Sequence, residues 1–270
     1  MESFYKTFLS IFCIFLLTTL CACDIKQKQE KYDLLDSIKA KKIFVVGINK
    51  DSRPFGYIDE ETNGITGFDA DLIKEISKYV FNSDKIVRFE EVTPSNRILK
   101  LNAKDVDVVI STMTINHDRM RVVDFSNPYF MSGQAVLVKK DDNIRTGKDL
   151  NYKKIGIVLG TTASDNIRYI APYAQITGFK NYKDAFKELQ NGNIDAISTD
   201  DVILQGIIAQ NPEYKLLPDR YSTEFYGIAF RKDEDSKTLK EEVNKALGNL
   251  EKTGKLKKLE QKYSVNYRRR

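Results

Sequence analysis

The stretch Val106-Asp-Val-Val-Ile-Ser-Thr-Met-Thr-Ile-Asn-His-Asp-Arg119 decides the fold of this chain, because it joins a buried strand directly to a polar segment. The run from Val106 to Ile110 is almost wholly apolar, which is typical of a parallel strand covered on both faces. Hydroxyl side chains and one arginine follow at its carboxyl end. Open α/β sheets bind ligands outside that end of their strands. We therefore predict an α/β fold with a small-molecule site just after Ile110.

Strand and helix patterns alternate along the rest of the chain. Apolar runs typical of strands occur at residues 43–48, 87–92, 106–110, 135–138, 155–158 and 194–198. Two of these runs have similar sequences: both Val106-Asp-Val-Val-Ile-Ser-Thr112 and Ile194-Asp-Ala-Ile-Ser-Thr199 end in Ser-Thr. This repetition predicts two similar α/β lobes whose strand ends face a shared cleft.

The order of the patterns predicts that the first lobe is discontinuous. Lobe 1 is expected at residues 41–132, lobe 2 at residues 133–222, and a return segment of lobe 1 at residues 223–265. The chain would cross between the lobes twice, near residues 131–134 and near residues 222–226, and two such connections make a hinge. The basic tail at residues 266–270 is expected to be a solvated end.

The N-terminus, residues 1–22, has the features of a signal peptide. Lys6 precedes a mainly apolar run from Phe8 to Leu20, and a run of about 13 residues is too short to span a bilayer comfortably. Leu20-Cys-Ala-Cys23 resembles a bacterial lipobox, in which the last cysteine carries a diacylglyceryl group, although Cys21 departs from the usual residue there. We therefore expect export, anchoring of Cys23 in the lipid bilayer, and a polar tether over residues 23–40. A plain signal peptide and an uncleaved membrane anchor are the alternatives.

Composition and residue usage exclude several classes of protein. The net charge of +5 is mild, and basic residues are interleaved with acidic ones, so nucleic acid is not an expected partner. With Cys13 and Cys21 lost in the signal and Cys23 lipidated, no cysteine remains for a disulfide or a metal site. The single histidine, His117, is expected to be solvated. Because no metal-ligand spacing, serine elbow or phosphate loop occurs, we expect no metal, no cofactor and no catalytic residue.

Taken together, the motifs resemble family 3 of the bacterial extracellular solute-binding proteins, the polar amino-acid receptors of ABC importers. The resemblance covers about residues 40–263. Its motifs, in order, are Gly47-x6-Pro54-Phe55, Gly67-Phe68-x-x-Asp71-Leu72, Ser111-Thr112-x-Thr114-x4-Arg119, Asp124-Phe125-Ser126-x-Pro128-Tyr129, Gly160-Thr161-Thr162 and Asp195-Ala196-x3-Asp200.

The resemblance implies a two-lobed periplasmic-binding-protein-like fold of type II. Each lobe would be a mixed, mostly parallel sheet flanked by helices, with the ligand in the cleft. It also implies an extracytoplasmic receptor, at the cell surface or in the periplasm, that delivers its ligand to an ABC transporter permease and its ATPase. Such a receptor is not an enzyme, but the same fold hosts a few dehydratases, which form the enzymatic alternative.

The resemblance also implies a site for the ligand's α-carboxylate. Arg119 matches the family's carboxylate clamp, and its planar fork suits two parallel hydrogen bonds to a carboxylate. Thr161 and Thr162 stand at an expected helix start, where backbone N–H groups and the helix dipole attract an anion, and the Thr162 amide would complete the site from lobe 2. The alternatives are a surface arginine and a simple N-cap.

A separate set of residues would hold the ligand's ammonium group. Asp200 matches the family's ammonium-binding acid, helped by the Thr112 carbonyl and the Thr114 hydroxyl. Asp200 could instead merely cap the helix that starts at Asp201.

Ligand specificity depends on Asn96-Arg97-Ile98. This segment resembles the one that supplies a second arginine to the side-chain carboxylate in acidic amino-acid receptors, so glutamate or aspartate is the favoured ligand. It also occurs in receptors for glutamine or other neutral polar amino acids, where the arginine is partly structural, and this is the alternative. Asn49 replaces an acid common in receptors for cationic ligands, which argues against lysine, arginine and histidine. Because Ser52 stands where many members have a stacking aromatic, the roof of the pocket is left to three candidates, Arg53, Phe55 and Tyr57.

Overall fold

The computed structural model describes residues 33–265. The predicted signal peptide, the lipidation site Cys23, the first part of the predicted tether and the basic tail at residues 266–270 lie outside the described residues. Within residues 33–265, no helix combines the length and the apolar character that crossing a membrane requires.

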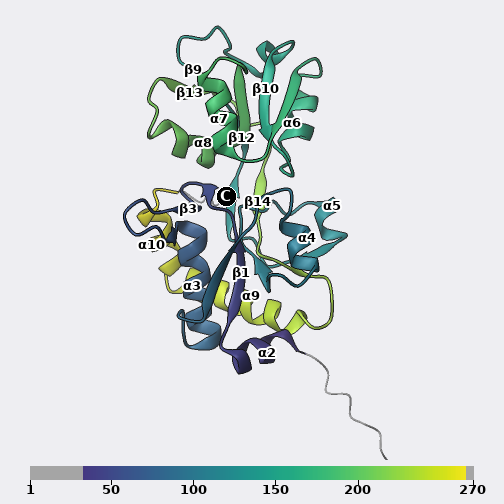
Figure 1. The fold of residues 1–270 in the computed structure, drawn as a ribbon, viewed down its shortest axis with the longest axis vertical. Helices are drawn as coiled ribbons and strands as arrows, with labels where there is room; N and C mark the ends of the chain where they lie inside the picture. The colour runs from purple at the N-terminus through teal and green to yellow at the C-terminus, as the bar shows by residue number, and fades with distance from the viewer. Residues whose placement is uncertain (1–32, 266–270) are drawn as a thin grey trace, which may run out of the picture. The chain divides into compact units, whose positions relative to one another are not determined.

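Lobe 1, in which Figure 1 labels the strand β1, is built on a five-stranded sheet of order β5-β1-β6-β15-β7. Its strands are β1 (Phe44–Ile48), β5 (Val87–Glu91), β6 (Val108–Val109), β7 (Val123–Phe125) and β15 (Ala229–Arg231). β1 pairs in parallel with β5 and β6, whereas β15 runs antiparallel to β6 and β7. β15 belongs to the return segment, so the first lobe is discontinuous in the chain.

Helices cover both faces of this sheet. Successive side chains of a strand point to opposite faces, and apolar side chains on each face pack against helices. On one face, Phe44 and Val46 of β1 share a core with α3 (Phe68–Phe81) and α9 (Lys237–Lys252), and α10 (Lys255–Lys262) packs against both helices. On the other face, Val45 packs with Leu101 of α4 (Arg97–Asn102). The strand ends therefore lie between two helical layers, as the sequence predicts.

Lobe 2 repeats this architecture with a sheet of order β11-β10-β12-β9-β13. Its strands are β9 (Gln134–Lys139), β10 (Lys154–Val158), β11 (Gln175–Phe179), β12 (Ala196–Asp200) and β13 (Tyr214–Leu216). β10 is parallel to β11 and β12, and β9 is antiparallel to β12 and β13. α6 (Ala163–Ile170) covers one face, while α7 (Tyr182–Gln190) and α8 (Asp201–Ile208) cover the other, and the short helix η1 (Gly147–Leu150) precedes β10. The fold is thus α/β with two lobes.

Two antiparallel strands carry the chain between the sheets. β8 (Phe130–Ser132) leads into lobe 2, and β14 (Glu224–Tyr226) leads back to lobe 1. The two predicted crossings therefore pair with each other in a ribbon, which we call the connecting ribbon. The lobe boundaries proposed from the sequence, at residues 132/133 and 222/223, lie beside it.

A small sheet and a helix complete lobe 1. The strands β2 (Asp51–Ser52), β3 (Gly56–Ile58) and β4 (Ile65–Thr66) form a separate three-stranded sheet after β1. α5 (His117–Met120) is a single turn before β7.

The predicted tether is wrong over its last residues. Residues 34–41 form the helix α2 (Leu34–Lys41), whose N-cap Asp33 accepts a hydrogen bond from the Asp36 amide. Leu34 and Ile38 are buried in the lobe 1 core, where α2 packs against α9, because polar residues between them occupy the outer face of the helix. The sequence indicated an amphipathic turn at the end of the tether, but this turn begins earlier, at Leu34, and belongs to the folded lobe.

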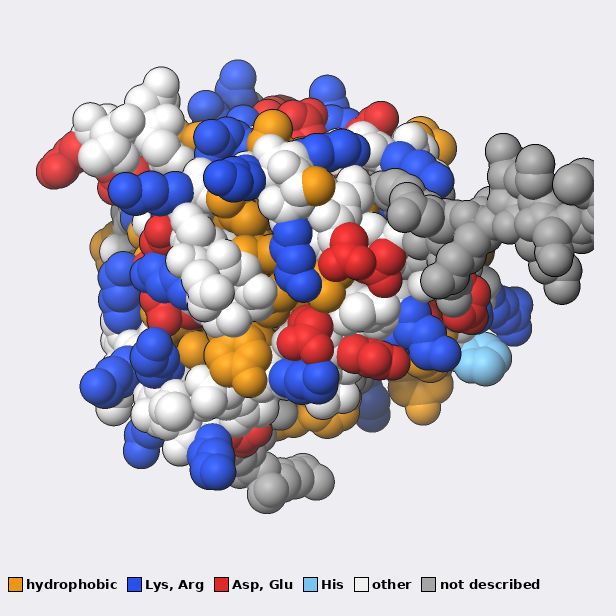
Figure 2. All heavy atoms as spheres, turned by 90° about the horizontal axis from the view of Figure 1, so that it is seen from below, with side chains coloured by type: hydrophobic (Ala, Val, Ile, Leu, Met, Phe, Trp, Pro, Cys, Tyr) orange, Lys and Arg blue, Asp and Glu red, His pale blue; other side chains and the backbone are white. Residues whose placement is uncertain are grey.

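The surface carries interleaved charges of both signs, as Figure 2 shows for one face. Ion pairs such as Lys78 with Glu75 and Lys262 with Asp71 link neighbouring basic and acidic side chains at 2.7 Å and 2.6 Å. Exposed pairs of this kind contribute little to stability, about 1 kcal/mol or less. On this face the basic residues are dispersed among acids.

Candidate functional site

The predicted binding residues come together where β6 of lobe 1 and β12 of lobe 2 end. Arg119 follows β6 on α5, and Asp200 is the last residue of β12. Tyr226 and Thr114 connect them: the Tyr226 hydroxyl donates to Asp200, the Tyr226 backbone bridges Thr114, and the Thr114 carbonyl accepts a hydrogen bond from Arg119. Both are at least nine-tenths buried. A buried guanidinium and a buried carboxylate from different lobes thus share one site.

Arg119 is fixed at both its backbone and its side chain. The N-cap Asn116 accepts a hydrogen bond from the Arg119 amide at 2.9 Å. The guanidinium Nη1 donates to the Thr114 carbonyl at 2.8 Å, and Nη2 donates to the Gly160 carbonyl at 3.0 Å. Burial lowers the pKa of Arg119, and the negative charges of Glu224 and Asp200 oppose that effect. The guanidinium of Arg119, in lobe 1, is therefore hydrogen-bonded to the backbone of lobe 2.

The loop between β10 and α6 brings lobe 2 to this fork. Gly160 has φ +83°, and a Cβ there would lie 2.4 Å from the Pro94 carbonyl oxygen, so only glycine allows this close approach. The Thr161 hydroxyl donates to the end of β10 at 2.7 Å. Thr162 is the N-cap of α6, but its hydroxyl donates to Glu224 Oε1 at 3.3 Å instead of capping the helix. The predicted anion-binding loop therefore lies beside Arg119.

Asp200 does not serve as the simple helix cap that the sequence allows as an alternative. It occupies the N-cap position of α8 without a side-chain capping bond, and its Oδ2 accepts a hydrogen bond from the Tyr226 hydroxyl. Burial, followed by the negative charge of Glu224, raises the pKa of Asp200 to about 7. A nearby cation would lower that pKa and favour the ionised form.

Thr112 and Thr114 lie in the same region, on the segment after β6. Thr112 has φ +43°, and its amide donates to Asp69 Oδ2 at 3.1 Å. Thr114 forms a backbone bridge with Tyr226 and gives its carbonyl to Arg119. The carbonyl of Thr114, not only the hydroxyl that the sequence suggested, is thus part of the site.

Arg97, the predicted reader of a side-chain carboxylate, is engaged with the backbone. It is 2% exposed, and its Nη1 donates to the Ser111 carbonyl at 2.6 Å. Its Nη2 reaches the Gly160 carbonyl at 3.4 Å. Burial, and then the positive charge of Arg119, lowers the pKa of Arg97 to about 9. This geometry favours the structural alternative for Arg97.

Two residues of the first loop have different positions. Asn49 is buried directly after β1, and its Oδ1 accepts a hydrogen bond from the Asp51 amide at 2.7 Å. Phe55 is not at the roof of a pocket, so that prediction is corrected. Its fully buried ring packs with edge-to-face geometry against Phe68, Phe130 and Tyr226, at centroid distances of 5.9, 5.0 and 5.5 Å.

Sequence reasoning missed two residues of the connecting ribbon. Tyr226 bonds Asp200, and Glu224 accepts hydrogen bonds from Ser222 Oγ at 2.7 Å and Asn166 Nδ2 at 3.1 Å. Glu224 is 4% exposed. The available signal was an acid followed by two aromatic residues in a predicted crossing between lobes, which is where a site between lobes draws its residues.

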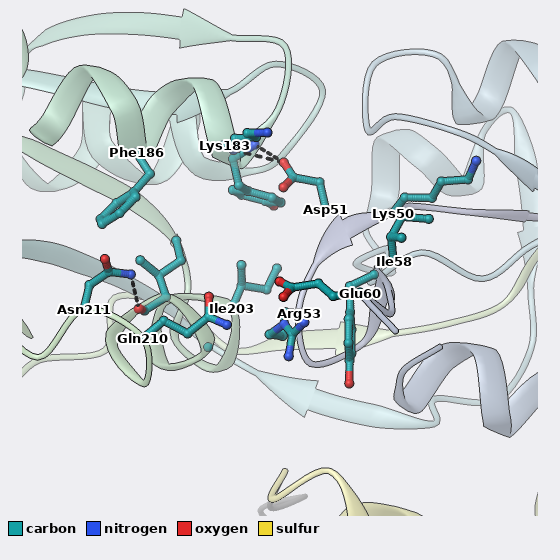
Figure 3. A pocket seen from close by; sticks show the side chains of 14 residues that line it. Lys50, Asp51, Arg53, Ile58, Glu60, Lys183, Phe186, Ile203, Gln210 and Asn211 are labelled. Carbon is teal, nitrogen blue, oxygen red and sulfur yellow. Dashed lines mark hydrogen bonds between the residues drawn. The ribbon is translucent and has the colours of Figure 1, made fainter. Parts of the chain in front are cut away.

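A groove of about 450 Å³ lies between the loop after β1 and helices α7 and α8 (Figure 3). The Asp51 carboxylate of lobe 1 contacts lobe 2, where it accepts hydrogen bonds from the backbone amides of Tyr182 and Lys183 at 2.5 and 3.1 Å. Arg53, another candidate for the roof, stacks over Tyr57 at 3.8 Å from the ring centre. Both residues line this groove.

The described residues offer no evident metal site. Within residues 33–265, no group of three or more His, Cys, Asp or Glu side chains could hold a metal ion.

The model of the bacterial extracellular solute-binding proteins, family 3, matches residues 44–266. The chain belongs to this family. It is similar to the ABC transporter glutamine-binding protein GlnH of Bacillus subtilis (strain 168), at 36% identity over 262 residues, 94% of this chain and 95% of that protein. It is also similar to a glutamine-binding protein of Geobacillus stearothermophilus, at 41% identity over 202 residues, 74% of this chain and 76% of that protein.

A solved structure supports the same assignment. An ancestral arginine-binding protein bound to glutamine matches with a TM-score of 0.77 and 36% identity, covering 83% of this chain and 99% of that one. The family 3 assignment confirms the resemblance found in the sequence, and the two-lobed type II fold is confirmed with it.

Proposed function

We propose that this family 3 protein is the extracytoplasmic receptor of an ABC importer and that it binds glutamine or another neutral polar L-amino acid. The observation that carries the proposal is the buried pair of opposite charges, Arg119 from lobe 1, which donates to the Gly160 carbonyl, and Asp200 from lobe 2, which accepts from the Tyr226 hydroxyl. An α-amino acid has one carboxylate and one ammonium group. The guanidinium suits the first and the carboxylate suits the second.

The acidic ligand that the sequence favoured is replaced in this proposal by the neutral alternative. The guanidinium of Arg97 already donates to Ser111 and Gly160, so it is poorly placed to neutralise a second ligand carboxylate. The curated relatives described above are named as glutamine-binding proteins. An amide side chain carries no charge and needs no such partner.

Binding from two lobes explains how a receptor would signal its occupied state. Arg119 Nη2 donates to the Gly160 carbonyl, and a ligand carboxylate would take over that hydrogen bond. A ligand held by lobe 1 through Arg119 and by lobe 2 through Asp200 stabilises the closed arrangement more than an open one. The ABC permease with its ATPase would recognise the closed form, and the lipidated Cys23 would hold the receptor at the membrane.

The test is calorimetric titration of the mature chain, begun at Asp24 and refolded to remove carried-over ligand, against the twenty amino acids. We expect glutamine to bind at least about tenfold more tightly than glutamate. Tighter binding of glutamate would restore the acidic specificity, and binding of no amino acid would overturn the receptor proposal. Recovery of the bound amino acid unchanged after incubation separates a receptor from the dehydratase alternative.

Arg119→Ala tests the carboxylate clamp directly. Removing one partner of a buried, hydrogen-bonded charge pair costs about 2 to 5 kcal/mol, so affinity for every bound amino acid should fall at least about 30-fold. Arg121→Ala is the matched control, because Arg121 ends the same helical turn with an exposed side chain. Equal affinities of the Arg119 and Arg121 variants would remove Arg119 from the site.

A further inference from the structure

Thr112 has a backbone conformation that a threonine rarely adopts. Its φ of +43° lies in the left-handed region, which is unfavourable for a β-branched residue. Such conformations are energetically unfavourable and persist only where the surroundings hold them, often at functional sites. Thr112 is also one of the residues expected to receive the ligand's ammonium group. What holds this residue therefore bears on binding.

The peptide group between Ser111 and Thr112 is held at both of its ends by opposite charges. Its N–H donates to Asp69 Oδ2 at 3.1 Å, and its C=O accepts Arg97 Nη1 at 2.6 Å. Asp69 comes from α3 and Arg97 from α4, on different sides of the strand end. Because a peptide plane rotates as a unit, fixing both ends fixes the orientation of the whole group. We call this arrangement the peptide clamp.

Burying the ionisable side chains of the peptide clamp, Asp69 and Arg97, costs free energy, which indicates a role other than stability. Asp69 has no exposed surface and Arg97 is 2% exposed. Burial raises the pKa of Asp69 to about 7, and the positive charge of Arg97 acts against that rise. Buried charges of this kind are often no better for stability than apolar residues of the same volume. The pair is therefore better explained by what it orients than by what it stabilises.

The peptide clamp also reaches the opposite lobe. Arg97 Nη2 lies 3.4 Å from the Gly160 carbonyl, the same atom that accepts Arg119 Nη2. One side chain thus connects the Ser111 carbonyl in lobe 1 with the loop that would bind the ligand's carboxylate in lobe 2.

We propose that Asp69 and Arg97 are positioning residues that act as one unit: they lock the Ser111–Thr112 peptide, hold Thr112 in its left-handed φ, and so set the direction of the following carbonyl, that of Thr112, which would receive the ligand's ammonium group. The inference rests on the proposed function, and it gives Arg97 a role other than contact with a ligand side chain. Neither residue needs to touch the ligand. Their shared effect on affinity passes through the Ser111–Thr112 peptide, while Arg97 alone also contacts the Gly160 carbonyl.

A double-mutant cycle on the mature chain tests this unit, with Asp69→Asn, Arg97→Lys and the double variant. Each single variant should weaken L-glutamine binding about tenfold. The double variant should also bind about tenfold more weakly than the wild type, and not a hundredfold, because either change alone already frees the peptide. The matched control is Asp71→Asn, two residues further along α3, since Asp71 pairs with Lys262 and Tyr263 away from the clamp. The proposal would be overturned if the losses of affinity in the two single variants multiplied in the double variant, or if Asp71→Asn weakened L-glutamine binding as much as Asp69→Asn does.

A second measurement needs no ligand. In nuclear magnetic resonance spectra of the ligand-free chain, Asp69→Asn and Arg97→Lys should both shift the Thr112 amide strongly, although they alter different helices. An unchanged Thr112 amide in either folded variant would contradict the peptide clamp. Because this measurement is independent of glutamine, it separates failure of the clamp from failure of the receptor proposal.

Discussion

Asp200→Asn should stabilise the ligand-free protein at neutral and basic pH while it removes binding. Asp200 is buried near the negative charge of Glu224, and its pKa rises from 3.8 to about 7. In the unfolded chain the carboxyl group ionises near pH 4, but in the fold it keeps its proton until about pH 7. The fold therefore binds the extra proton between these values, and its stability decreases as the pH rises from about 4 to about 7. Asparagine cannot ionise and avoids this loss.

The size of the effect follows from the shift in pKa. A rise from 3.8 to about 7 is roughly three units, and each unit is worth 1.36 kcal/mol, so ionising Asp200 in the fold costs at most about 4 kcal/mol. Asparagine can still accept the hydrogen bond from Tyr226 through its amide oxygen. We expect Asp200→Asn to raise the free energy of unfolding at pH 8 by about 1 to 4 kcal/mol, which for a domain of this size is a Tm increase of several degrees.

Urea and thermal unfolding of both proteins at pH 8 and pH 4, without amino acid, provide the assay. The difference should be present at pH 8 and absent at pH 4, where Asp200 is protonated in the folded wild type. Asp165→Asn, an exposed acid in the first turn of α6, is the control and should show no such pH-dependent gain. A stability difference that is the same at both pH values would refute the reasoning, because it would not arise from ionisation.

Two further predictions concern the approach of the lobes and the membrane anchor. Gly160→Ala should weaken glutamine binding and lower the free energy of unfolding more than Gly192→Ala in calorimetry and urea unfolding. Both glycines have positive φ, but only a Cβ at Gly160 would meet the other lobe, at the Pro94 carbonyl, so equal effects would count against close contact there. Cys23→Ala should release the protein from membranes in cell fractionation, whereas Cys21→Ala, which changes only the signal, should not. Continued membrane attachment of the Cys23 variant would rule out lipidation there.

The two-lobed fold could be predicted because its signals are local. The buried runs ending at Ile110 and Thr199 show both the strands and the edge of the sheet where polar residues gather. Arg119 follows the first strand end closely and Asp200 ends the second strand, and their meeting in one site was expected because the family resemblance implies two lobes that face a shared cleft. Buried apolar runs and the polar residues at their ends can be recognised in the sequence without knowing which distant residues are in contact.

The parts that were missed depend on distant contacts. Phe55 follows a proline in a loop, and only its packing against Phe130 and Tyr226 distinguishes a core ring from a pocket roof. Glu224 lies more than 50 residues from Thr162 and Asn166, whose side chains bond it. Two roles stayed open for Arg97, contact with a ligand or a structural one, because the sequence could not reveal that two backbone carbonyls accept hydrogen bonds from it.

The connecting ribbon has a consequence for how such a receptor can change over time. Tyr226 bonds Asp200 of lobe 2 while its backbone bridges Thr114 of lobe 1, and Glu224 bonds the first turns of α6. The strand about which the lobes would turn is therefore also part of the wall of the site. If the proposed function holds, we expect a substitution there to change ligand preference and opening rate together, so that selection for a new ligand along this strand would also alter the rate of release.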